Sequence, residues 1–249
     1  MIFRELEYRT GVQIDAALAR IRSYVFLMGM AAQFHFWKGL DLIEKPKLVD
    51  SICDEMGDDD KSSYLERLPK LVDDTIAQNE RCIQLWSAEC EMDEPKSYLV
   101  ERAKLIELFE RFEFRPHAYE RLVRQDDKPL LSSAITFLGM SQELTPEAKE
   151  VEAVVRMKLK EFVKIELKIK HDLTELDEVR LELSSAYEAL AAEMVERQAA
   201  KDSTTLTSAM WGLKKAASYY DYKKGFGFPG YARAWIQNAI DKRKGIEGT

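Results

Sequence analysis

The sequence predicts an all-α protein. Only 11 glycines and 7 prolines interrupt its 249 residues, and the stretches between them are rich in Glu, Lys, Leu and Ala, which favour helix. Apolar residues recur at helical spacing, whereas the alternation typical of strands is scarce. The length and a hydrophobic content of 46% allow a sizeable core, in one large domain or in two smaller ones.

The predicted helices begin with residues 13–45, which form one or two helices because six apolar side chains share a stripe. An acidic loop at 54–60 follows, with Asp60 as the N-cap of a helix over 63–86. The stripe consists of Ile14, Ala17, Leu18, Ile21, Val25 and Met28.

A turn at residues 92–95 leads to a helix over 97–112. This helix ends before Pro116, because proline disfavours helical geometry in the residue that precedes it. Pro116 then opens a short helix over 117–124.

The next helical region starts with Thr145 as cap and Pro146 at the first helical position, and it continues to Ala200 without glycine or proline. A strong helix-start signal at 172–177 predicts two long antiparallel helices within it. After a loop at 201–205 come an amphipathic helix, a tight turn at 225–230 and a last helix over 231–244. We expect Trp211 and Ile240 to belong to the core of this last part.

Charge and aromatic residues divide the chain at about residue 200. Residues 205–249 hold 8 of the 25 aromatic residues and carry a net charge of +5, from eight Lys/Arg and three Asp/Glu. The whole chain carries −7, so residues 1–204 carry −12. We therefore distinguish an acidic helical region, 1–200, from a terminal segment, 201–249, that suits nucleic acid because cations neutralise phosphates and rings stack on unpaired bases.

The three cysteines, Cys53, Cys82 and Cys90, form no CxxC pair, and an odd number argues against a disulfide framework. No apolar run approaches the length of a membrane span, and the amino terminus lacks the pattern of a signal peptide. We expect a soluble cytoplasmic protein with no membrane partner.

The chemistry of the terminal segment lies in rings next to polar and cationic side chains. Phe226 and Phe228 flank a glycine in a stiff turn, and Tyr231, Trp235 and Asn238 share a face of the last helix. Any single ring could equally well be core. The other candidates are Gln237 and Asp241 on a second stripe, and the cations Lys223, Lys224, Arg233 and Lys242.

The stretch from Gly212 to Ile240 resembles the promoter-melting and minus-ten-reading helices of bacterial sigma factors of the sigma-70 family. Their pattern runs from G-L-x-[KR]-A to Y-A-x-x-W-I-[RQ]-x-A-I, and this chain has 17 ordered matches in 29 residues. A weaker likeness lies upstream, where residues 105–123 resemble the helical linker that is inserted in housekeeping-type sigma factors. The resemblance implies a multi-helix, sigma region 2-like domain with an inserted linker region.

The resemblance also implies partners and roles. Such a domain binds the clamp helices of the RNA polymerase largest subunit and captures the non-template strand of the minus-ten element, with bases flipped into pockets. By position, Phe226, Phe228 and Tyr231 would line a base pocket, and Lys223 and Lys224 would contact the strand backbone.

Three departures from the family pattern change these expectations. Ala234 replaces the first of two tryptophans, beside Trp235, which predicts weaker unaided melting or dependence on a further activator. Asn238 and Asp241 replace the usual glutamine and threonine, which predicts an altered sequence preference. The helix that grips polymerase lacks its acidic and amide residues, and the positions that would replace them are Thr204, Thr205, Thr207, Ser208 and Trp211.

Two readings of the function remain open. The first is a sigma-like initiation factor, and the second is a helical polymerase-binding regulator that does not read DNA. The chain stops at Thr249, before the family's further domains, as expected of a minimal, phage-encoded or accessory factor, or of a fragment.

We expect no enzyme, no cofactor and no metal site. His35, His117 and His171 are isolated, with no histidine or cysteine at ligand spacing. The sequence has neither a phosphate-cradling glycine loop nor a nucleophile elbow.

Overall fold

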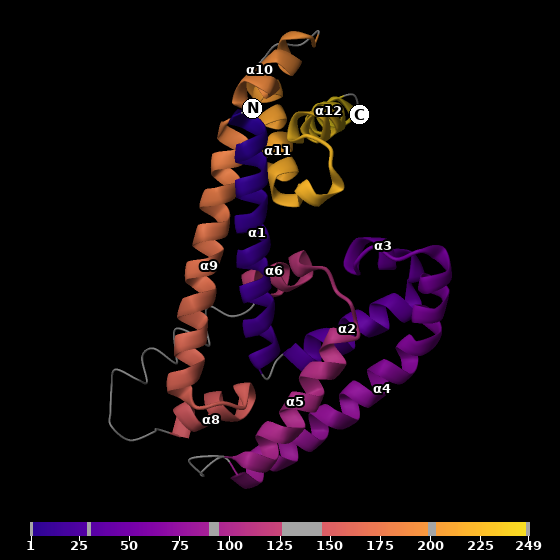
Figure 1. Ribbon diagram of the computed structural model, residues 1–249, viewed down its shortest axis with the longest axis vertical. Coiled ribbons are helices and arrows are strands. Elements are labelled where there is room, and N and C mark those ends of the chain that lie inside the picture. The colour runs from indigo at the N-terminus through magenta and orange to yellow at the C-terminus, as the bar shows by residue number, and fades with distance from the viewer. Residues whose placement is uncertain (1, 29–30, 90–94, 126–145, 199–202, 248–249) are drawn as a thin grey trace. The chain divides into compact units, whose positions relative to one another are not determined.

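The structure, a computed structural model, describes residues 2–28, 31–89, 95–125, 146–198 and 203–247. These residues are helical almost throughout, which confirms the all-α class, and their only extended pairing is an isolated bridge between Cys53 and Phe114 (Figure 1). By packing, the chain forms two compact units, of which unit 1 comprises residues 1–17 and 172–249 and unit 2 comprises residues 18–171. This grouping differs from a division at residue 200, because the first half of the first helix belongs with the terminal segment.

Unit 2 contains most of the acidic region. The second half of α1 (Ile2–Leu27) leads into α2 (Ala31–Glu44), the short η1 (Pro46–Leu48) and α3 (Val49–Ile52). The helices α4 (Asp58–Glu89), α5 (Lys96–Glu110), α6 (Pro116–Gln125) and α8 (Pro146–Val155) follow, and then the first half of α9 (Leu159–Ser185). Within this unit α4 packs along both α2 and α5.

The centre of unit 2 is a buried histidine among aromatic rings. The imidazole of His35 is 0% exposed and lies between the rings of Phe109, at 4.2 Å, and Phe114, at 5.2 Å. Its Nδ1–H donates to the carbonyl of Ala31 at 2.7 Å, which fixes the tautomer. The hydroxyl of Tyr119 lies 3.5 Å from Nε2. Burial lowers the pKa of His35 to about 3, so the ring is neutral in the folded protein.

Unit 1 is built around two crossing helices, α11 (Ser203–Tyr219) and α12 (Phe228–Glu247), which the short η2 (Tyr222–Lys224) connects (Figure 1). The helix α10 (Glu188–Glu196) packs on both. The first half of α1 and the second half of α9 complete the unit.

A glycine allows α11 and α12 to approach closely. A Cβ at Gly212 would lie 2.8 Å from both the Cα of Ile236 and the carbonyl oxygen of Trp235. These are backbone atoms that cannot move without shifting the whole helix. The core beneath the crossing includes Ala209, Leu213, Ala216, Ala232, Ile236 and Ile240.

Several expectations about elements were wrong. The helix α9 runs unbroken through 172–177, and the breaks fall instead near Arg156, with φ 52°, and at Tyr187. A buried stripe at intervals of seven holds α9 together across the start signal: Phe162, Ile169, Leu176 and Leu183. Asp60 lies in the first turn of α4 rather than at its cap.

Other expectations were confirmed, one was wrong, and some concern residues that the structure does not describe. Pro116 and Pro146 each open a helix, and Ile240 is buried as expected. Trp211 is 52% exposed, so its assignment to the core was wrong. The cap Thr145, most of the turn at 92–95 and the start of the loop at 201–205 lie outside the described residues. In the described part of the chain, no helix is both long and apolar enough to cross a membrane.

Replacing His35 by Gln should remove a pH-dependent part of the stability. Unfolding lets His35 take up a proton at its ordinary pKa of about 6.5, while the folded protein resists protonation down to about pH 3. The stability that the neutral ring provides is therefore complete above about pH 6.5 and falls by about 1.4 kcal/mol per unit below it. Urea unfolding of both proteins should show their difference in unfolding free energy changing by about 2 kcal/mol between pH 6.5 and pH 5; parallel pH profiles would contradict this assignment.

Gly212→Ala should destabilise unit 1 by roughly 1–3 kcal/mol, because the added methyl meets backbone at 2.8 Å. Gly230→Ala is the matched control. It adds the same methyl to the first turn of α12, where the methyl would meet no other part of the protein within 4 Å beyond the adjoining backbone of its own helix, and should leave the unfolding free energy unchanged or raise it. Thermal unfolding measures both, and equal effects of the two substitutions would count against the close crossing.

Candidate nucleic-acid interface

The turn between α11 and α12 is held by a side-chain cap and by a glycine in the left-handed conformation. The side chain of Asp221 accepts a hydrogen bond from the backbone N–H of Lys223 at 3.0 Å. Gly225 ends η2 in the left-handed conformation, with φ 76°, which favours glycine. We call residues 221–227 the cationic turn. It leaves Phe226 43% exposed and delivers Phe228, at 0% exposure, into the core.

Four rings from α11, the cationic turn and α12 form a continuous row, which we call the aromatic strip: Tyr219, Phe226, Tyr231 and Trp235. Phe226 stacks on Tyr231 with ring centroids 5.7 Å apart, and Trp235 stacks on Tyr219 at 5.6 Å. The edge contact between Tyr231 and Trp235, at 6.1 Å, joins the two pairs. All four rings retain exposed surface, so the strip presents aromatic surface to solvent.

Buried groups below the strip hold it in place. Phe228 packs against Tyr187 at 5.0 Å and Tyr220 at 5.2 Å. The hydroxyl of Tyr220 donates to the carbonyl of Phe226 at 2.9 Å, and the hydroxyl of Tyr231 donates to the carbonyl of Tyr219 at 3.1 Å. In this conformation Phe228 supports the strip from within and offers no surface to a base.

Glu7 of α1 is the residue that sequence reasoning missed. It is 6% exposed, and its carboxylate accepts hydrogen bonds from the hydroxyls of Tyr187, at 2.5 Å, and Tyr220, at 3.4 Å. Burial and then the Glu7 carboxylate raise the pKa of Tyr220 to about 12, and the same causes raise the pKa of Tyr187. The amino-terminal pattern gave no signal of this role, because a glutamate in a charged helix is typical of a solvated face.

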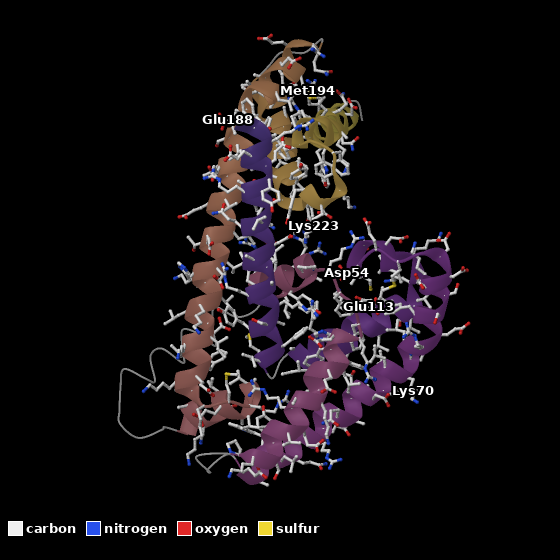
Figure 2. All side chains as sticks on the ribbon, in the orientation of Figure 1. Asp54, Lys70, Glu113, Glu188, Met194 and Lys223 are labelled. Atoms are coloured by element: carbon white, nitrogen blue, oxygen red, sulfur yellow. The ribbon has the colours of Figure 1, made fainter. Side chains whose placement is uncertain are left out.

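The cationic candidates lie on the cationic turn and on α12. Lys224 is exposed, and its charge acts on the Tyr231 hydroxyl. Lys223, on the same turn (Figure 2), pairs with Asp15 at 2.5 Å. Arg233 pairs with Glu193 at 3.7 Å. Lys242 is exposed farther along α12.

The polar candidates lie on the later turns of α12. Gln237 donates to Asp241 at 2.9 Å, and its side-chain oxygen lies 3.5 Å from the amide nitrogen of Gln198. Asn238 is exposed, as is Ala234 next to Trp235. A ring at position 234 would therefore have enlarged the exposed aromatic surface.

The candidates for binding polymerase lie on α11, and the structure does not bring all of them together. Thr204, Thr207 and Trp211 are exposed on one side of the helix, with Ser208 partly covered between them. Thr205 points inward and accepts a hydrogen bond from Arg243 at 3.0 Å. Lys215 extends this face, with its ammonium 5.5 Å from the Trp211 ring centre.

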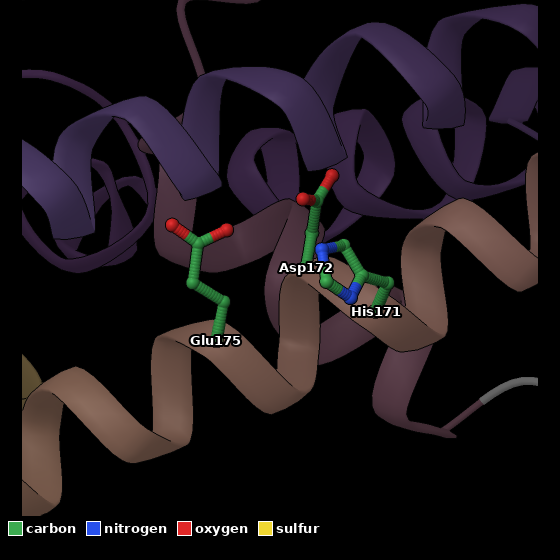
Figure 3. A group of neighbouring side chains, drawn as sticks. All are labelled: His171, Asp172 and Glu175. Atoms are coloured by element: carbon green, nitrogen blue, oxygen red, sulfur yellow. The ribbon is translucent and has the colours of Figure 1, made fainter.

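A separate group on α9 could hold a metal by residue type. The ligand atoms of His171, Asp172 and Glu175 lie within 4.8 Å of one another (Figure 3). His171 and Glu175 share a face because they are four residues apart. Three such side chains within one turn are common on solvated helices, so this group alone does not define a metal site.

The interface as a whole can stack unpaired bases on a supported aromatic strip while lysines neutralise phosphates. Duplex DNA offers no such base faces, so the geometry favours a single strand.

Comparison with known proteins adds no relative, since no family model matches the chain and no curated protein matches it.

Proposed function

We propose that this protein is a sigma-like transcription initiation factor, which binds RNA polymerase core and captures the non-template strand of a minus-ten-like promoter element. The observation that carries the proposal is the aromatic strip. Its four rings keep exposed surface although each could have been core, and while burial raises the pKa of Tyr231 in the strip, the charge of the exposed Lys224 lowers it. The pattern shared with the sigma-70 family, from Gly212 to Ile240, supports the assignment to promoter DNA.

The strip suits strand capture because stacking is worth roughly 1–3 kcal/mol per base and requires no particular base. Phe226 and Tyr231 provide the ring pair nearest the cationic turn, where the strand backbone would pass. Trp235 and Tyr219 provide the second pair. Phe228 is buried and supports the strip from within. This supporting role accounts for the aromatic residue that the family pattern has at this position.

Polymerase would bind the exposed face of α11, where Trp211 is the largest exposed side chain. This helix contains no carboxylate, and Lys214 and Lys215 are its charged residues. Binding of polymerase by α11 would therefore depend on the ring of Trp211 and on hydroxyl groups rather than on acidic residues.

The rival function is a polymerase-binding regulator that does not read DNA. One observation favours it: Lys223 and Arg233 already have acidic partners, Asp15 and Glu193. Both pairs are about half exposed and so are weak, and a phosphate can displace them. The two functions differ in whether single-stranded DNA binds at all.

Phe226→Ala and Tyr231→Ala should each weaken binding of a single-stranded, A/T-rich oligonucleotide by roughly 5- to 150-fold, the equivalent of one lost stacking contact. Fluorescence anisotropy, with and without core polymerase, measures the affinity. Tyr231→Phe is the matched control, since it keeps the ring, loses only the hydrogen bonds of the hydroxyl to Tyr219 and Trp235, and should bind within about threefold of the parent. Unchanged affinity in both alanine variants would rule out strand capture by the strip.

Trp211→Ala should weaken association with cognate core polymerase at least about tenfold, because exposed tryptophans dominate many interfaces. The fold should be unaffected, within about 0.5 kcal/mol, because the ring is half exposed. Trp37→Ala in unit 2 removes another exposed tryptophan and serves as the control. Equal retention of core by the parent and by Trp211→Ala in a pull-down assay would exclude this face as the polymerase contact.

A further inference from the structure

The cationic turn packs against the first helix, α1. A Cβ at Gly11 would lie 2.3 Å from the ring of Tyr222, so that ring rests directly on the backbone of α1. The ring of Tyr8 meets Tyr222 edge-on at 5.5 Å. The turn is therefore held against one face of α1.

One turn beyond Gly11 on the same face, Asp15 reaches Lys223. The ammonium lies 2.5 Å from the Asp15 carboxylate, and this hydrogen bond raises the pKa of Lys223. Lys223 also lies 5.7 Å from the centre of the Tyr222 ring. Its side chain is thus directed toward α1, whereas the charge of its neighbour Lys224 acts on the strip.

We propose that Asp15 is an internal competitor of nucleic-acid phosphate for Lys223, and so sets how tightly the strip holds a single strand. The proposal rests on the proposed function and assigns a residue of the amino-terminal helix to the same interface. A carboxylate offers the lysine the same chemistry as a phosphate oxygen. A strand that crosses the strip must take Lys223 from Asp15, and the released carboxylate then lies beside the strand and repels it.

Asp15 competes only weakly with phosphate, because its ion pair with Lys223 is partly exposed to solvent. Both side chains are about half exposed, at 63% and 42%, so water and salt screen the pair. Asp15 therefore lowers affinity for any strand by a small, salt-dependent factor rather than blocking the interface. Such a factor favours strands that also engage the rings.

The test is the affinity of Asp15→Asn for a short single-stranded, A/T-rich oligonucleotide. We expect binding about two- to fivefold tighter than the parent at about 50 mM salt, with the difference shrinking toward about 200 mM. In a Lys223→Gln background, Asp15→Asn should change affinity less than about 1.5-fold, because the competed lysine is absent.

Glu182→Gln is the matched control. It removes one negative charge from another exposed ion pair with α1, that with Arg9, but does not touch the cationic turn. An equal gain in Glu182→Gln, or an undiminished gain in the Lys223→Gln background, would reduce the effect to net charge and overturn the proposal. Parent-like affinity of Asp15→Asn would overturn it while leaving strand capture intact, whereas absence of binding by every protein would overturn both.

Discussion

The arrangement of the aromatic strip in unit 1 depends on the buried side chain of Glu7. Burying a carboxyl group is costly unless donors satisfy its oxygens; the hydroxyl of Tyr187 donates to it at 2.5 Å, and the hydroxyl of Tyr220 lies 3.4 Å away. These bonds tie α1 to the turn after α9 and to the end of α11. The single hydroxyl proton of Tyr220 lies between the Glu7 carboxyl group, at 3.4 Å, and the carbonyl of Phe226, at 2.9 Å, so Tyr220 links Glu7 to the backbone of Phe226. The exposed rings are therefore positioned by a residue more than two hundred positions earlier in the chain.

Much of the fold could be predicted from the sequence, because helix formation here is local. Sparse glycine, prolines at helix starts and apolar stripes located most helices to within a few residues. The error in α9 arose because a local start signal at 172–177 competed with a stripe of buried side chains that continues through it, and tertiary packing decided the outcome. The composition boundary at residue 200 does not indicate that the first half of α1 groups with residues 172–249, because packing between distant segments leaves no periodic signal.

The candidate site was predictable in its residue types but not in its orientations. Phe226 and Phe228 are two apart in a turn, and spacing cannot tell which ring faces solvent; the backbone after Gly225 decides it. Trp211 was expected in the core because tryptophan usually is, yet the crossing at Gly212 places its side chain on the outer face of α11. Asp15 and Glu7 carry no motif, and only their contacts reveal them.

The central claim is that the aromatic strip takes up unpaired bases. Fluorescence of 2-aminopurine, substituted at successive positions of an A/T-rich single strand, reports stacking at each base directly. The account predicts that the protein changes the emission at one or two adjacent positions, and that a duplex of the same sequence shows no change. A response spread evenly over all positions, or an equal response from the duplex, would contradict it.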